Sequence, residues 1–137
     1  MPLLTRDTEI GDLLATARTI AVVGLSDNPA RDSNRVAAYL TRAGYLIIPV
    51  NPAVRSVFGL KAYPRLSDVR TPIDIVDVFR RPEHMADVLD EAVAVGARAL
   101  WMQPGTVHRE AAERAVQTPL AVVLERCIMV EHRRLIS

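Results

Sequence analysis

The stretch Thr19-Ile20-Ala21-Val22-Val23-Gly24-Leu25-Ser26 decides the fold. Residues 19–24 are an apolar run that ends in glycine, which is typical of a central parallel strand buried on both faces. The turn residues Asp27, Asn28 and Pro29 follow it directly. We therefore expect a strand, a turn and then a helix.

Short apolar runs alternate with helical patterns on both sides of this strand. We expect an amphipathic helix over 8–17, and a second helix with its N-cap at Ser33 and its end at Gly44. A later helix carries Met85, Val88, Leu89, Ala92 and Val93 and ends at Gly96, and the last begins after an N-cap at Thr106. Further strands are expected at 45–50, 73–79, 97–102 and 120–124, with a short strand near 61–63 and a short helix around 67–69.

Such a βαβ series implies right-handed crossovers and helices on both faces of the sheet. The sequence predicts an α/β fold, a Rossmann-like three-layer α/β/α sandwich with a mostly parallel sheet. With 137 residues that are 50% hydrophobic, the chain fits a single domain over 1–137.

Composition argues against several classes of partner. A formal net charge of +1 gives no global field to recruit nucleic acid or an anionic membrane. No apolar run approaches the roughly 20 residues that span a bilayer. The single cysteine, Cys127, forms no internal disulfide, and the N-terminus has no signal-peptide pattern. We expect a cytoplasmic protein without a nucleic-acid or membrane partner.

Ligands of parallel α/β sheets bind beyond the carboxyl ends of the strands, which here follow Gly24, Val50, Phe79 and Met102. Gly24 is the first glycine of a G-x-G-x-x-G motif whose other glycines are missing. It still allows a tight turn and close approach by a phosphate. The hydroxyls of Ser26 and Ser33 lie near a helix N-terminus, which favours anions, and Arg31 and Arg35 add charge. The alternative is an ordinary strand end with a capped helix and solvated arginines.

The end of the second strand, Val50-Asn51-Pro52, lacks the carboxylate that usually holds the ribose of NAD. Arg55 lies just beyond it. This end suits a phosphorylated ribose, and two cofactors provide one: NADP and coenzyme A (CoA). An ordinary turn is the other interpretation.

The string Phe79-Arg80-Arg81-Pro82 is the best basic cluster in the chain, and its guanidinium groups suit a pyrophosphate. The alternative is a surface turn with salt bridges to Glu83 or Asp87. After the next strand, Gln103 provides an amide that fits the amides of a pantetheine arm.

Catalytic and metal-binding candidates are weak. Cys127 has no nucleophile motif around it and is expected to be a buried small residue. His84, His108 and His132 lack the spacing of zinc ligands, and the chain has neither a G-x-S-x-G elbow nor a Walker loop. We predict no catalytic residue and no metal site.

The sequence resembles the stand-alone CoA-binding domain proteins, which are related to the N-terminal domain of the succinyl-CoA synthetase α subunit. The resemblance covers nearly the whole chain and rests on residues 21–26, 50–52, 74–82 and 125–128, of which Asp-Ile-Val-Asp-Val-Phe-Arg-Arg-Pro at 74–82 is the most specific. It implies a Rossmann-type fold that binds CoA. One departure is Ala53, where many such proteins carry lysine, so that phosphate charge falls to Arg55 instead.

The resemblance places Gly24, Ser26, Arg31 and Ser33 near the phosphates. It places Val50, Asn51 and Pro52 at the adenosine, and Phe79, Arg80, Arg81 and Gln103 along the rest of the ligand. The candidate cofactor-binding residues are Gly24, Leu25, Ser26, Pro29, Arg31, Ser33, Val50, Asn51, Pro52, Phe79, Arg80, Arg81 and Gln103.

The expected function is the binding of CoA or an acyl-CoA without catalysis, because the phosphohistidine domain of the synthetases is not part of this chain. Two alternatives remain: an NADP-binding oxidoreductase-like domain, and a docking module for a synthetase-like partner. A homodimer or another protein partner is also compatible with the sequence.

Overall fold

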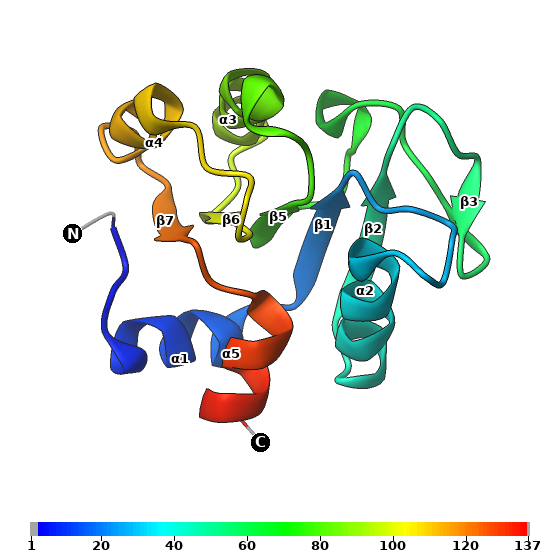
Figure 1. The fold of residues 1–137 in the computed structure, drawn as a ribbon, viewed down its shortest axis with the longest axis horizontal. Coiled ribbons are helices and arrows are strands. Elements are labelled where there is room, and N and C mark those ends of the chain that lie inside the picture. The colour runs from blue at the N-terminus through cyan, green and yellow to red at the C-terminus, as the bar shows by residue number, and fades with distance from the viewer. Residues whose placement is uncertain (1–2, 137) are drawn as a thin grey trace.

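The computed structural model describes residues 3–136. Its centre is a five-stranded sheet in the order β2-β1-β5-β6-β7, and every neighbouring pair is parallel (Figure 1). The strands are β1 (Thr19–Val23), β2 (Leu46–Val50), β5 (Ile75–Val78), β6 (Ala99–Met102) and β7 (Ala121–Leu124). A small antiparallel pair, β3 (Ser56–Val57) and β4 (Leu60–Lys61), lies between β2 and β5 in the chain.

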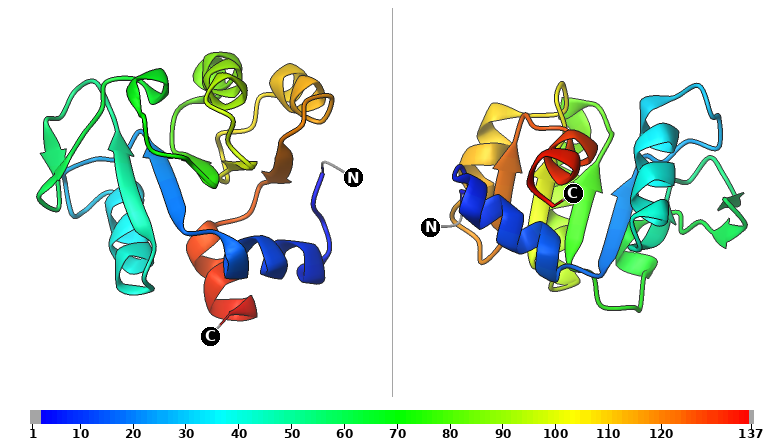
Figure 2. Two further views of the ribbon diagram at one scale, coloured as in Figure 1. Left: turned by 180° about the vertical axis from the view of Figure 1, so that it is seen from behind. Right: turned by 90° about the horizontal axis from the view of Figure 1, so that it is seen from below.

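Helices cover both faces of the sheet (Figures 1 and 2). On one face lie α1 (Asp7–Thr16), α2 (Asp32–Arg42) and α5 (Ile128–Leu135), and on the other α3 (Met85–Ala94) and α4 (Arg109–Ala115). Two short 3-10 turns, η1 (Leu66–Asp68) and η2 (Pro82–His84), complete the second face. The predicted three-layer α/β/α sandwich with a Rossmann-like fold is confirmed.

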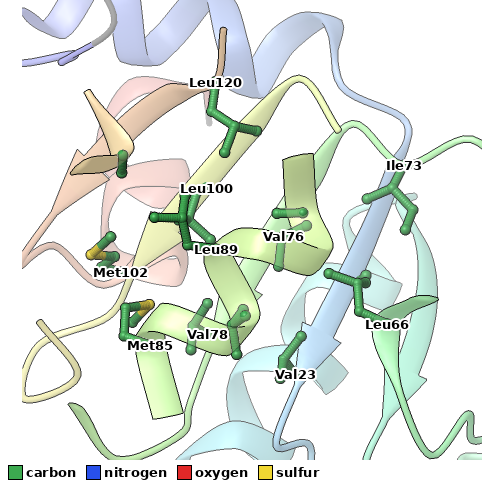
Figure 3. Close-up of a cluster of buried hydrophobic side chains, with 14 of the residues drawn as sticks. Val23, Leu66, Ile73, Val76, Val78, Met85, Leu89, Leu100, Met102 and Leu120 are labelled. Carbon is green, nitrogen blue, oxygen red and sulfur yellow. The ribbon is translucent and has the colours of Figure 1, made fainter. Parts of the chain in front are cut away.

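The core divides into two clusters, one on each side of the sheet. Every residue of β1, β5 and β6 is buried, which explains why these strands are mainly apolar rather than alternating; Asp77 of β5 is the buried exception. Figure 3 shows the cluster beneath α3, where Met85 and Leu89 pack against Val76, Val78 and Leu100. The opposite cluster contains Ile75 and Trp101 together with residues of α1, α2 and α5.

Two expected N-caps were wrong, and one helix was missed. Ser33 is not the N-cap of α2, because Arg31 holds that position. Thr106 is not the N-cap of α4. The ring Nδ1 of His108 caps that helix by accepting the N–H of Ala111, 3.2 Å away. Helix α5 was not predicted. None of the helices within residues 3–136 has the length and apolarity needed to cross a membrane.

Candidate functional site

The loops after β1, β2 and β5 meet at the carboxyl edge of the sheet, because the three strands are parallel neighbours (Figure 1). Backbone hydrogen bonds tie them together beyond the strand ends. The N–H of Gly24 donates to the carbonyl of Val50 at 2.7 Å, and the N–H of Phe79 donates to that of Val23 at 2.8 Å. Sequence-distant candidate residues are therefore brought to one edge.

Gly24 is in tight contact with the end of β5. Its φ is +86°, in the left-handed region that side chains disfavour. A Cβ at this position would lie 3.0 Å from Arg80 Cδ and 3.1 Å from the carbonyl oxygen of Phe79. The turn after β1 thus needs glycine both for its backbone conformation and for its approach to β5.

Ser26 is the centre of the turn after β1. Its N–H donates to Ser33 Oγ at 3.0 Å, its own Oγ accepts the N–H of Asn28 at 3.0 Å, and its carbonyl accepts Asn34 Nδ2 at 2.8 Å. Ser33 is only 6% exposed, so in this structure its hydroxyl shapes the loop. Leu25 is fully buried, whereas Gly24 and Ser26 on either side of it are partly exposed at the edge.

The outer part of this loop is solvent-exposed and cationic. Pro29 and Arg31 are exposed, and the Arg31 side chain has no hydrogen bond or ion pair in the described part of the chain. Arg35 differs, because its guanidinium binds Asp32 and the carbonyl of Ala30. Arg31 is therefore the cation of this loop that remains available to a ligand.

Asn51 joins the loops after β1 and β2. Its Nδ2 donates to the carbonyl of Leu25 at 3.0 Å, and its Oδ1 accepts the N–H of Ala53 at 2.8 Å. These bonds need a donor and an acceptor on one side chain, which an ionised aspartate does not provide. The presence of asparagine rather than aspartate at the end of β2 is therefore explained by these hydrogen bonds as well as by ligand preference.

A cavity of about 530 Å³ opens beside the ends of β1, β2 and β5. Its apolar wall includes Val23, Val50 and Pro52, and Arg80 and His84 line it from the side of β5. Three acids also line it. Of these, Glu91 and Asp90 form ion pairs with Arg65 and Arg114, whereas Asp87 forms none among residues 3–136.

The basic cluster after β5 does not form salt bridges. Over residues 3–136, neither Arg80 nor Arg81 makes an ion pair, with Glu83, Asp87 or any other acid. Arg80 is half-buried at the cavity and Arg81 is exposed. The salt-bridged surface turn that the sequence left open is therefore not present among residues 3–136.

A second cavity of about 250 Å³ lies on the other side of the end of β5. Phe79, Gln103, Cys127 and Met129 contribute to its walls. Gln103 is 4% exposed, and its Oε1 accepts the N–H of Ile128 at 3.1 Å. No described residue accepts a hydrogen bond from its Nε2. Because Phe79 and Arg80 are adjacent and each lines one cavity, the two cavities flank the same strand end.

Sequence reasoning missed several residues at this edge. Cys127, expected to be buried, is partly exposed at the smaller cavity, and Arg55 does not line the larger one. Asp77, in the middle of β5, is fully buried and neither carboxyl oxygen has a hydrogen-bond partner. Burial raises the pKa of Asp77 well above its usual range. Within residues 3–136, no group of three or more His, Cys, Asp or Glu side chains is placed to hold a metal ion.

The parallel sheet and its flanking helices define a Rossmann-like α/β protein, and its cavities lie at the edge where such folds bind ligands. Comparison of the sequence with protein families identifies the particular family. Residues 18–133 match the family model described as CoA binding domain, and the chain belongs to that family. The resemblance stated from the sequence is confirmed.

Three similar proteins were found by comparing sequences and structures. It is 42% identical over 124 residues to the Bacillus subtilis (strain 168) protein described as "Uncharacterized protein YneT", covering 90% of this chain and 92% of that one. A "hypothetical protein" of Pyrococcus horikoshii OT3 superposes with a TM-score of 0.94 at 38% identity, covering 97% of this chain and 94% of that one. A dinucleotide-forming acetyl-coenzyme A synthetase 1 of Ca. Korarchaeum cryptofilum gives a TM-score of 0.70 at 25% identity, where 82% of this chain matches 27% of the synthetase.

Proposed function

We propose that this chain binds CoA or an acyl-CoA across the carboxyl edge of its sheet. The observation that carries the proposal is the pair of cavities flanking Phe79 and Arg80. CoA has a nucleotide at one end, a thiol-bearing arm at the other and a pyrophosphate between them. Two cavities separated by an unpaired guanidinium match that order, and membership of the CoA binding domain family supports it.

The nucleotide occupies the larger cavity in this proposal. Val23, Val50 and Pro52 give apolar surface for the base and ribose. The unpaired carboxylate of Asp87 disfavours phosphate at the far side of this cavity. The phosphates therefore lie toward Arg80 and the turn after β1.

The pyrophosphate binds at Gly24, Leu25 and Ser26. Gly24 and Ser26 are partly exposed around the buried Leu25, and α2 begins just beyond this turn with its N-terminal end at the same edge. Arg31 and Arg81, with the loop at Pro29 and Ser33, provide the surrounding charge and shape.

The pantetheine arm extends into the smaller cavity. Phe79 gives it an apolar contact, and Gln103 Nε2 donates to one of its amide carbonyls. Asn51 does not contact the ligand in this proposal; it holds the loops after β1 and β2 in place. NADP also carries a ribose phosphate, and the family membership favours CoA over it.

Titration calorimetry tests the proposal with CoA, acetyl-CoA, dephospho-CoA and NADPH. We expect CoA to bind about tenfold or more tightly than dephospho-CoA, because a charge-assisted contact to the 3′-phosphate contributes about 1.5 kcal/mol or more. Substituting Arg55→Ala should remove that difference, since Arg55 is exposed after β2 and makes no ion pair among the described residues.

Arg70→Ala is the matched control. Arg70 is an exposed arginine on the segment before β5, at the opposite edge of the sheet, so that its loss removes the same charge outside the site. Arg80→Ala should weaken the binding of CoA and of dephospho-CoA by the same factor. Absence of CoA binding refutes the proposal, and NADPH binding that CoA does not displace replaces it with the NADP alternative.

A further inference from the structure

A groove between α2 and α5 adjoins the smaller cavity at the end of β5. It has a volume of about 560 Å³ and is lined by side chains of both helices and of the loop before α2. Arg35 and Met129 belong to the walls of both the groove and the smaller cavity. A ligand that fills the smaller cavity therefore has a continuous path into the groove.

The groove has an apolar surface between two helices that are joined by a hydrogen bond. Pro29, Ala38, Tyr39 and Met129 provide this surface. Tyr39 Oη of α2 lies 2.7 Å from Nδ1 of His132, a buried residue of α5. Because this bond links the two helices that form the groove, its shape is set before a ligand binds.

Every charged side chain that lines the groove is an arginine. Arg35, Arg42 and Arg133 contribute, and no aspartate or glutamate of residues 3–136 is part of the lining. Arg35 is paired with Asp32, and the guanidinium of Arg133 lies 5.5 Å from the centre of the Tyr39 ring. Arg42 is exposed and forms no ion pair within the described chain. The charge of the groove therefore favours an anionic group at Arg42.

The order of these residues along α2 sets the order of the contacts. Arg35, Ala38, Tyr39 and Arg42 have the spacing of one helix face. At a rise of about 1.5 Å per residue, Arg35 and Arg42 are separated by about 10 Å along the helix axis. A group that enters beside Arg35 therefore meets apolar surface first and the Arg42 guanidinium at the far end.

We propose that the groove binds the acyl group of an acyl-CoA whose far end carries a carboxylate. This inference rests on the proposed function, which places the pantetheine arm in the smaller cavity. The thioester then lies beside Arg35 and Met129. The methylene chain packs on Ala38 and Tyr39, and the terminal carboxylate pairs with Arg42. The ligand class that fits is a dicarboxylic acyl-CoA.

Titration calorimetry of the full-length chain with CoA, hexanoyl-CoA and adipoyl-CoA tests the proposal. The two acyl groups have the same number of carbons and differ in the terminal carboxylate. We expect hexanoyl-CoA to bind about tenfold more tightly than CoA, because the groove takes its methylenes out of water. Adipoyl-CoA should bind about three- to fivefold more tightly than hexanoyl-CoA, which is the size of effect expected of an exposed ion pair.

Two substitutions locate the acyl group. Ala38→Trp fills the groove and should remove the advantage of hexanoyl-CoA over CoA. Arg42→Gln keeps most of the side chain without its charge and should remove the advantage of adipoyl-CoA over hexanoyl-CoA, so it remains informative if the bulkier variant does not fold. The matched controls are Ala94→Trp in α3 and Arg109→Gln in α4, at exposed positions on the opposite face of the sheet. Both controls should retain the two differences in affinity.

The affinity for CoA itself separates the two ways of failing. If CoA binds and hexanoyl-CoA binds no more tightly, the acyl groove is wrong and the proposed function stands. If neither CoA nor an acyl-CoA binds, both are wrong. Equal affinities for hexanoyl-CoA and adipoyl-CoA overturn the carboxylate contact. Differences that persist in Ala38→Trp and Arg42→Gln overturn the groove as the place of the acyl group.

Discussion

The substitution Gly24→Ala tests the contact between the turn after β1 and the end of β5. The backbone cost of placing alanine at φ +86° is about 1–2 kcal/mol. A further cost comes from crowding, because the new Cβ would lie 3.1 Å from the carbonyl oxygen of Phe79 and 3.0 Å from Arg80 Cδ. Moving Phe79 by a few tenths of an ångström adds about 1–2 kcal/mol, as overpacking does in cores. We expect a total loss of about 2–4 kcal/mol in the free energy of unfolding.

Gly96→Ala is the matched control for this substitution. Gly96 has φ +73°, and a Cβ there would meet nothing within 4 Å. The control therefore carries the backbone strain without the crowding, and urea unfolding of the two variants should differ by about 1–2 kcal/mol.

Ligand affinity gives a second measurement on the same pair. Gly24→Ala displaces Phe79 and Arg80, which line the two cavities, so that CoA should bind about tenfold or more weakly. Gly96→Ala, at the end of α3 on the amino edge, should leave the affinity unchanged. Equal destabilisation of the two variants, together with equal CoA affinity, would refute the reasoning.

Two further predictions concern stability. Burial raises the pKa of Asp77 above its unfolded value of 3.8, so the folded chain loses stability as pH rises from about that value through the folded pKa. Urea unfolding between pH 4 and pH 8 should show this loss, and Asp77→Asn should lack it; parallel profiles would contradict it. Asn51→Ala removes the bonds to Leu25 and Ala53 and should cost about 1–3 kcal/mol, measured by the same method. A loss below about 0.5 kcal/mol would mean that solvent replaces both bonds.

The sheet was predictable because its signals are local and redundant. β1 is an apolar run closed by Gly24, and short, mainly apolar runs recur at β5 and β6, where every residue is buried. Because these strands are buried on both faces, apolar and polar residues do not alternate along them, and the strands are recognised as short apolar runs. β1 begins at Thr19 as expected, whereas β2, β5, β6 and β7 begin one or two residues later than expected, because the residues before them belong to loops.

The helix ends were harder to predict because caps depend on geometry. Ser33 and Thr106 have the side chains that favour N-caps, yet Ser33 binds the N–H of Ser26 and Thr106 donates to the carbonyl of Gln103. Arg31 and His108 occupy the N-cap positions instead. Helix α5 was missed for a related reason: Trp101 and Gln103, distant in sequence, hold its start.

The candidate site was predictable as a location and less so as a set of contacts. Parallel topology alone brings Gly24, Asn51, Phe79 and Gln103 to one edge. No sequence pattern predicts that Arg80 forms no ion pair with Glu83 or Asp87, although both are close to it along the chain. That outcome depends on where η2 directs each side chain, and it decides whether the edge keeps a free cation.

Strand β5 links the stability of the fold to the proposed site. Asp77 is a buried carboxyl without a hydrogen bond, which costs stability, and it lies two residues before Phe79, where the two cavities meet. Gly24, which is in tight contact with that strand end, costs conformational entropy on folding. Features that disfavour folding concentrate where a protein binds its ligand. On this argument the end of β5, rather than the glycine turn alone, is the centre of the proposed site.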